Sequence, residues 1–171
     1  MEPNLLVSYD ARGGYMSGKS EIHNILTKLG DQKSDQELLV PGIIGVKTKL
    51  AGRDVVEEVR EMFASDPNSL THTLKWVPAD LWCAGTLDGI KATVREDIKE
   101  MFMADDQYAI DVVKHRSDLH KEQIVEMIAP MLRGKVNLEH PQKVLRIELF
   151  DKLASVTLLK PKDVFSVVRG E

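Results

Sequence analysis

The strongest constraint on the fold is that the period of the hydrophobic pattern changes repeatedly within the first 78 residues. Four short runs have the composition or alternation of strands, at 5–9, 38–40, 43–50 and 71–77. Two segments have apolar residues at helical spacing, at 22–30 and 53–65. The predicted order is strand, helix, strand, strand, helix, strand, which is that of a ferredoxin-like split βαβ unit.

The pattern restarts after Pro78. It predicts two helices, one over 86–103 and one from Ser117 or Asp118 to Gly134 with a kink at Pro130. It also predicts a strand at 108–113 that runs into 114–116, and two alternating strands at 145–149 and 154–158 joined by a hairpin. We therefore expect an α+β protein with a ferredoxin-like domain at 1–78 and a second α/β domain at 79–171.

Charge is divided unevenly along the 171 residues. Residues 1–111 contain 12 basic and 19 acidic residues, whereas residues 112–171 contain 11 basic and 8 acidic residues. The net charge of -4 therefore combines an acidic body of -7 with a basic end of +3. This asymmetry is expected when one face of a protein meets a phosphate backbone.

Basic and polar side chains gather at the predicted strand ends of this basic end. Lysine and arginine can pair with phosphate oxygens, and asparagine can contact a ribose or a base edge. The candidate RNA contacts are Lys114, His115, Arg116, His120, Lys135, Asn137, Lys143, Arg146, Lys160 and Lys162. We expect the cluster as a whole, rather than any single member, to bind RNA.

A glycine-rich segment near the N-terminus supports a different function. Gly13 to Ser20 matches the pattern G-x-x-x-x-G-K-[ST], follows a strand and precedes a helix. The alternative function is therefore a P-loop nucleotide-binding enzyme, with Lys19 on the outer phosphates and Ser20 on magnesium. An intermediate interpretation is that Arg12, Lys19 and the helix N–H groups form a phosphate site for RNA. The enzyme is disfavoured because three residues separate the apolar strand from Gly13.

Two segments of the second half resemble a known family. Residues 135–148, Lys-Val-Asn-Leu-Glu-His-Pro-Gln-Lys-Val-Leu-Arg-Ile-Glu, and residues 108–120 are similar to the most characteristic stretches of the THUMP domain. The resemblance covers about 80–165, and the preceding βαββαβ unit is similar to the ferredoxin-like domain that usually precedes THUMP. It implies a tRNA-binding module of RNA-modifying systems.

The end of the chain resembles one branch of that family. After Leu158 it lacks the glycine-rich link of the enzyme-attached members. It is more similar to stand-alone members, which act as tRNA-binding adaptors for the acetyltransferase that makes acetylcytidine. The resemblance therefore implies two partners, tRNA and a tRNA-modifying enzyme of the acetyltransferase type, and no catalytic residues. Two small binding units fill 171 residues, so the modifying enzyme is expected to be another protein.

Composition limits the remaining possibilities. The single cysteine, Cys83, excludes an intramolecular disulfide and a multi-cysteine zinc site, and it fits a cytoplasmic protein. No run of 18 apolar residues is present, so we expect no membrane-spanning helix. No pattern calls for a cofactor or a metal ion, and we expect neither.

Overall fold

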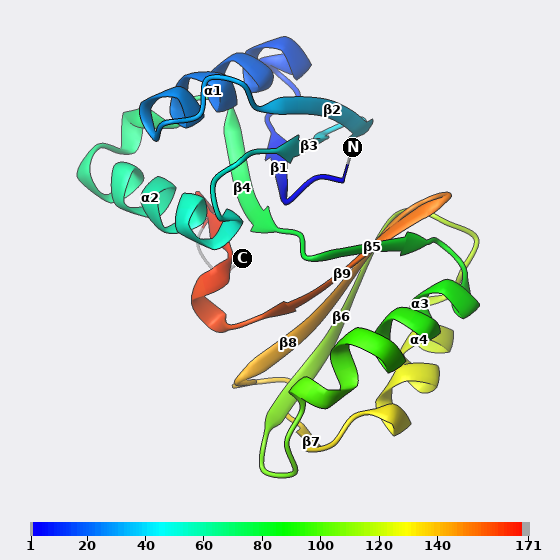
Figure 1. Cartoon of the computed structure of the whole chain (residues 1–171). Helices are drawn as coiled ribbons and strands as arrows, with labels where there is room; N and C mark the ends of the chain where they lie inside the picture. The colour runs from blue at the N-terminus through cyan, green and yellow to red at the C-terminus, as the bar shows by residue number, and fades with distance from the viewer. Residues whose placement is uncertain (1, 169–171) are drawn as a thin grey trace. The chain divides into compact units, whose positions relative to one another are not determined.

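The computed structural model describes residues 2–168 and divides them into two compact units (Figure 1). Unit 1 contains residues 2–79 and 162–168, and unit 2 contains residues 80–161. No helix of the described residues is long and apolar enough to cross a membrane.

Unit 1 contains the predicted βαββαβ order. Its strands are β1 (Leu5–Tyr9), β2 (Asp35–Val40), β3 (Ile43–Lys47), β4 (Thr73–Pro78) and the added β10 (Phe165–Ser166). The helices are α1 (Gly14–Lys28) and α2 (Gly52–Ser65), followed by the 3₁₀ turn η1 (Pro67–Ser69). The antiparallel sheet has the strand order β10-β4-β1-β3-β2, which leaves β2 at an edge.

The core of unit 1 forms where the apolar stripes of both helices meet one face of the sheet. Leu5 and Val7 alternate on β1 and point to this face. Helix α1 contributes Ile22 and Leu26, and α2 contributes Val56, all of them inaccessible to solvent. This packing fixes which side of α1 is left at the surface.

The C-terminal segment belongs to unit 1, whereas the sequence assigned residues 79–171 to the second domain. Phe165 pairs with Trp76 of β4, and its ring lies 5.5 Å from the ring of Phe63. The carbonyl oxygens of Lys162 and Val164 accept hydrogen bonds from Arg60. A two-residue strand carries no period, so the sequence pattern could not reveal it. Residues 169–171 of the predicted domain lie outside the described residues.

Unit 2 is a second mixed α/β layer structure, in agreement with the predicted α+β class. Its strands are β5 (Leu81–Ala84), β6 (Gln107–Arg116), β7 (Lys135–Val136), β8 (Lys143–Phe150) and β9 (Leu153–Leu159). The sheet order is β5-β9-β8-β6-β7. Strand β6 runs parallel to both β7 and β8, while the other pairs are antiparallel. The 3₁₀ turn η5 (Pro161–Asp163) follows β9.

The helices of unit 2 are less regular than predicted. The predicted helix over 86–103 consists of α3 (Leu87–Thr93), a π-helical turn η2 (Val94–Ile98) and a 3₁₀ turn η3 (Lys99–Met101). Helix α4 (Lys121–Ile128) gives way to the 3₁₀ turn η4 (Ala129–Met131), because Pro130 has no N–H to continue the helix.

The helices of unit 2 cover one face of its sheet, as Figure 1 shows for α3 and α4. Leu145, Ile147 and Leu149 alternate along β8 and pack under Ile90 and Ile124 of the two helices. The intervening residues of β8, Arg146 and Glu148 among them, face the opposite side of the sheet. This second face carries the polar groups described below.

Candidate nucleic-acid interface

The predicted RNA contacts of unit 2 are divided between the two ends of strand β6. Lys135 pairs with Gln107 at the start of β6, whereas Arg116 ends the strand opposite Phe150. Ten residues of strand span about 30 Å at roughly 3.3 Å per residue. Lys135, Asn137 and Lys143 therefore cannot share one small site with Lys114 and Arg116.

Lys143 is bound within the N-terminal end of the sheet. Its Nζ donates to the carbonyl oxygen of Met101 at 2.6 Å and to Oδ2 of Asp106 at 2.6 Å. The same ammonium lies 5.8 Å from the centre of the Phe102 ring. The hydrogen bond from Lys143 holds the pKa of Asp106 below its usual value. These contacts fasten the segment before β6 to β8.

Asn137 is also occupied by structural hydrogen bonds. Its Nδ2 donates to Oε1 of Gln107 at 2.6 Å. Its Oδ1 accepts from the backbone N–H groups of Glu139 and His140 at 3.1 and 3.0 Å. The side chain thus shapes the loop between β7 and β8. Lys135 is exposed beside it, and Lys160 follows the end of β9, which lies next to Lys143 in the register.

His115 and Arg146 converge on a buried carboxylate. Glu148 is 4% exposed, and its Oε1 lies 2.8 Å from Nε2 of His115 while Oε2 accepts from Nε of Arg146 at 3.0 Å. Arg146 also pairs with Asp111 at 3.0 Å. Burial raises the pKa of Glu148, but the bonds and charges of His115 and Arg146 outweigh it and leave the pKa below the usual value. These two predicted contacts are therefore engaged inside the protein.

An aromatic stack extends this network. The ring of His115 is stacked on Phe150 with 4.8 Å between centres, and Phe150 lies 5.8 Å from Trp82 of β5. The stack holds the imidazole of His115 in place against Glu148. Its neighbours along β6, Lys114 and Arg116, are exposed.

Several exposed basic side chains of unit 2 lie near the C-terminal end of β6. Four of them form what we call the β6 terminal patch: Lys114, Arg116, Lys121 and Lys152. The hairpin that carries Lys152 is joined to the strand end, because the N–H of Asp151 donates to the carbonyl oxygen of Arg116. His120 is the N-cap of α4 in a capping box with Gln123, so it positions the helix that presents Lys121.

Lys121 and Lys152 are members of the patch that the sequence did not indicate. The sequence feature that could have indicated Lys121 is its position at the start of a predicted helix. For Lys152 it is its position in the predicted hairpin, which returns to the end of β6. Unit 2 as a whole holds 12 basic and 14 acidic residues over 80–161. The case for a nucleic-acid interface therefore rests on this local patch and not on the net charge of the unit.

The glycine-rich segment of unit 1 does not form a phosphate loop. Helix α1, expected from about residue 22, begins at Gly14, so Lys19 and Ser20 lie in its second turn. Gly18 is buried, and a Cβ there would come 2.8 Å from the Cβ of Tyr9. Glycine at this position allows α1 to lie close to β1, and no loop N–H groups surround Lys19.

The remaining predicted contacts of unit 1 have different surroundings. Arg12 is 91% exposed and pairs with Asp10 at 2.8 Å, which lowers the pKa of Asp10 to about 2. The ammonium of Lys19 lies 5.7 Å from the centre of the Tyr15 ring. Lys162 is exposed, and only its carbonyl oxygen takes part in a described bond. Among residues 2–168, no group of three or more His, Cys, Asp or Glu is arranged to hold a metal ion.

Comparison with protein families finds one match, which lies within unit 2. Residues 84–159 match the profile of the THUMP domain, and this range runs from the end of β5 to the end of β9. The resemblance seen in residues 108–120 and 135–148 is thereby confirmed for the domain. No curated protein matches the chain at a significant level.

Solved structures share the fold of nearly the whole chain. PH1313 from Pyrococcus horikoshii matches with a TM-score of 0.63 and 14% identity over 96% of this chain and 55% of its own. TrmN from Thermus thermophilus matches with a TM-score of 0.61 and 8% identity over 92% and 46%. A 4-thiouridine synthetase bound to RNA and ATP matches with a TM-score of 0.52 and 9% identity over 96% and 42%. The chain thus spans about half the length of these structures.

Proposed function

We propose that the chain binds tRNA through the β6 terminal patch of its THUMP domain. The observation that carries this proposal is that Lys114, Arg116, Lys121 and Lys152 are exposed together at one end of the domain, with no side-chain partner among the described residues. Unpaired cations of this kind are suited to phosphate oxygens, and arginine can bind two of them at once. One of the structures with this fold, the 4-thiouridine synthetase, is itself bound to RNA.

The mode of recognition follows from the residues of the patch. Lysine and arginine contact the phosphate backbone, which fixes orientation without reading base sequence. Structured RNA is read mainly by shape and backbone contacts. The described aromatic side chains near the patch, Phe150 and Trp82, are engaged in the sheet-face stack and do not offer a platform for bases. We therefore expect binding to many tRNAs with similar affinity.

We further propose that the chain is a non-catalytic adaptor that presents tRNA to a modifying enzyme. Support comes from Gly13–Ser20, the segment on which the competing nucleotide-binding enzyme depended, because most of it forms the first two turns of α1. The resemblance of the segment after Leu158 to the adaptor members of the family points to a cytidine acetyltransferase as the partner, acting in the cytoplasm. This part of the proposal rests on resemblance, not on a contact in the structure.

The two ends of β6 provide a matched test of tRNA binding. The paired substitutions Lys114→Ala and Arg116→Ala remove one lysine and one arginine from the patch, and Arg133→Ala with Lys135→Ala remove the same residue types near the other end. We expect the first pair to weaken tRNA binding roughly 10- to 100-fold and to reduce the log–log salt slope by about two. The second pair should change affinity less than about threefold. Equal losses from both pairs would contradict the patch.

The adaptor proposal has a separate test. The tagged chain is used to capture its partners from a native lysate, with ribonuclease treatment in a parallel sample to remove bridging RNA. Mass spectrometry should identify an acetyltransferase that survives the treatment. Capture of a methyltransferase or thiolation enzyme instead would overturn the acetylation step while leaving tRNA binding in place.

A further inference from the structure

The tip of the β8–β9 hairpin is bonded to the strand ends on both of its sides. It consists of Asp151 and Lys152, which lie between the two strands. The N–H of Asp151 donates to the carbonyl oxygen of Arg116 at the end of β6. The carbonyl oxygen of Lys152 accepts the N–H of Gly85, which directly follows β5, at 2.8 Å. We call these four residues the hairpin clamp, and two of them, Arg116 and Lys152, belong to the β6 terminal patch.

Gly85 is the member of the hairpin clamp with the least room for a side chain. A Cβ at this position would overlap the carbonyl oxygen of Asp151 and would lie 3.2 Å from the backbone nitrogen and oxygen of Leu153. These are backbone atoms of the hairpin, so they cannot rotate away as the end of a long side chain could. Gly85 does not have a positive φ, so glycine is needed here for close approach. A larger residue must displace the tip of the hairpin from its place.

The backbone of the tip is constrained as well. Asp151 has a φ of 72° and is the only residue other than glycine with a positive φ in the part of the chain that the structure describes. Aspartate and asparagine adopt this left-handed conformation far more readily than β-branched residues do. Phe150, just before the tip, pairs both with Arg116 of β6 and with Leu153 of β9. The turn is therefore closed within two residues, and the backbone position of Lys152 is set by its neighbours.

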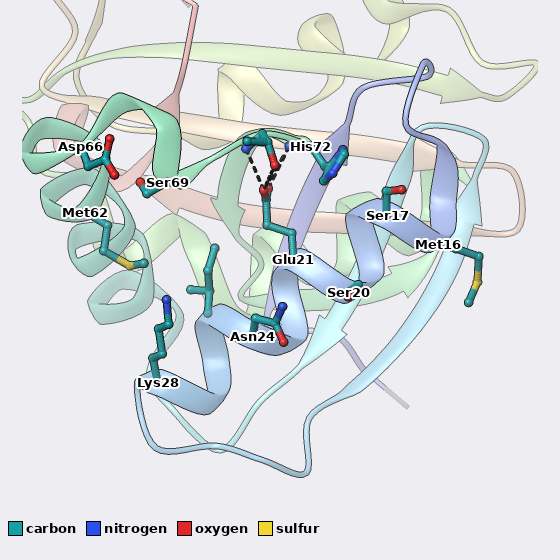
Figure 2. A pocket seen from close by; sticks show the side chains of 12 residues that line it. Met16, Ser17, Ser20, Glu21, Asn24, Lys28, Met62, Asp66, Ser69 and His72 are labelled. Carbon is teal, nitrogen blue, oxygen red and sulfur yellow. Dashed lines mark hydrogen bonds between the residues drawn. The ribbon is translucent and has the colours of Figure 1, made fainter.

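A comparable connection in unit 1 has no such relation to basic residues (Figure 2). Glu21 of α1 accepts the backbone N–H groups of Thr71 and Thr73 at 2.7 and 2.6 Å, which joins the helix to the start of β4. The pocket beside it, of about 660 Å³, is lined by a second carboxylate, that of Asp66. This connection holds two elements together beside two carboxylates, whereas the hairpin clamp includes two exposed cations.

We propose that Gly85 is a positioning residue for tRNA binding, because its close fit against the hairpin tip holds Lys152 next to the end of β6. This inference rests on the proposed tRNA binding and adds the residue that sets the geometry of the patch. Lysine has a flexible side chain, so the region that its ammonium can reach depends on the position of its backbone. Cations that are already in place before RNA arrives lower the cost of ordering on binding. Gly85 itself acts only through Lys152.

A double-mutant cycle of tRNA binding tests this dependence. Gly85→Ala and Lys152→Ala should each weaken binding roughly three- to tenfold, and each should lower the log–log salt slope by as much as about one. In the Lys152→Ala background, Gly85→Ala should add less than about a twofold loss, because the lysine through which it acts is already absent. The same loss from Gly85→Ala in both backgrounds, or wild-type affinity in Gly85→Ala, would overturn the proposal.

A glycine of unit 1 provides the matched control. A Cβ at Gly52 would lie 2.7 Å from the carbonyl oxygen of Asn4, so Gly52→Ala introduces a similar conflict with the backbone away from the patch. Both variants should lose stability, which urea denaturation measures, and both are titrated with tRNA under conditions where they remain folded. The affinity of Gly52→Ala should stay within about twofold of the wild type. A loss as large as that of Gly85→Ala would show that general destabilisation, and not positioning, weakens binding.

A second pair of variants moves the tip without a change at Gly85. Asp151→Asn and Asp151→Val remove the same charge, but asparagine accepts the positive φ and valine does not. The valine variant should therefore bind tRNA several-fold more weakly than the asparagine variant. This difference should shrink to less than about twofold in the Lys152→Ala background. Equal affinities of the two variants would contradict a role for the tip in positioning.

The outcomes for the two proposals can be told apart. If the wild-type chain does not bind tRNA, the function proposed for unit 2 fails and the positioning role fails with it. If the paired substitutions Lys114→Ala and Arg116→Ala weaken binding but Gly85→Ala does not, the patch is supported and only the role of Gly85 is overturned. Unchanged affinity in Lys152→Ala also overturns that role, because no cation would then depend on the tip.

Discussion

The two ends of strand β6 carry similar residue types but use them differently. At the N-terminal end, Lys143 and Asn137 are held by neighbouring loop and strand groups. At the C-terminal end, Lys114 and Arg116 are exposed, and no described residue pairs with their side chains. Basic and polar side chains thus stabilise the fold at the N-terminal end of β6, whereas the basic side chains at its C-terminal end are available to a ligand.

The region near the C-terminal end shows why the two uses lie so close together. His115 turns to the buried Glu148, while the residues on either side of it in β6 are exposed. The register of β6 against β8 shifts between Lys114 and Arg116, so the regular alternation of strand faces is interrupted at His115. The buried pair of His115 and Glu148 thus lies at this irregularity, next to both proposed RNA contacts.

The largest expected effect is on stability, from loss of the buried carboxylate. Glu148→Ala leaves Arg146, which is 12% exposed, without its main partner and leaves His115 with no acceptor. Breaking a buried pair by removing one member costs about 3–5 kcal/mol. We expect a loss of this size in the free energy of unfolding, measured by urea denaturation.

The control for this substitution is the other carboxylate on Arg146. Asp111 is 48% exposed, so solvent screens its pair, and Asp111→Ala should cost less than about 1 kcal/mol. A loss below about 1 kcal/mol for Glu148→Ala as well would show that the network does not hold the strand end. The comparison of the two ends would then lose its structural basis.

The next effect tests the N-terminal end of β6. Asn137→Ala removes the bonds to Gln107, Glu139 and His140, which should destabilise the protein by roughly 1–2 kcal/mol. The affinity of the folded protein for tRNA should stay within about twofold of the wild type. Urea denaturation and a binding titration at low denaturant give the two values. A large loss of affinity with unchanged stability would return Asn137 to the RNA interface.

Much of the fold could be predicted because the local spacing of apolar residues indicates its strands and helices. The alternation in 145–149 and 154–158 and the restart after Pro78 were sufficient to place the main strands. Strands β5, β7 and β10 were missed, since they have only four, two and two residues and no alternation of their own. They pair with distant strands, β9, β6 and β4, which a local pattern cannot show.

The site was harder to predict because its pairings are long-range. His115 and Glu148 are 33 residues apart, and Lys143 and Asp106 are 37 apart. Only the parallel register of β6 and β8 brings these groups together. A count of lysines and histidines at strand ends therefore located the region but could not separate bound from exposed side chains.

A smaller effect concerns the acid dependence of the N-terminal end. Lys143 lowers the pKa of Asp106, so the folded state binds fewer protons there than the unfolded chain, whose aspartates titrate near about 3.9. The stabilisation is present above that pH and is lost as pH falls through the lowered pKa. In Lys143→Met, the pKa of Asp106 should rise and stability should depend less on pH below about 4. Carboxyl NMR titration checks the shift, and an unchanged pKa would contradict the pairing.

The smallest expected effect is that of Lys135→Ala, and it is the sharpest test of the difference between the ends. Lys135 is exposed in β7, and only its backbone is bonded, to the carbonyl oxygen of Asp106. Truncating an exposed side chain should change stability by less than about 0.5 kcal/mol. It should change tRNA affinity less than twofold, whereas Lys121→Ala in the β6 terminal patch should weaken binding several-fold. Parallel titrations compare the tRNA affinity of the two variants. An equal loss of affinity in Lys135→Ala and Lys121→Ala would contradict the difference between the ends. It would mean that exposure alone, and not position at the C-terminal end of β6, determines which cations contact RNA.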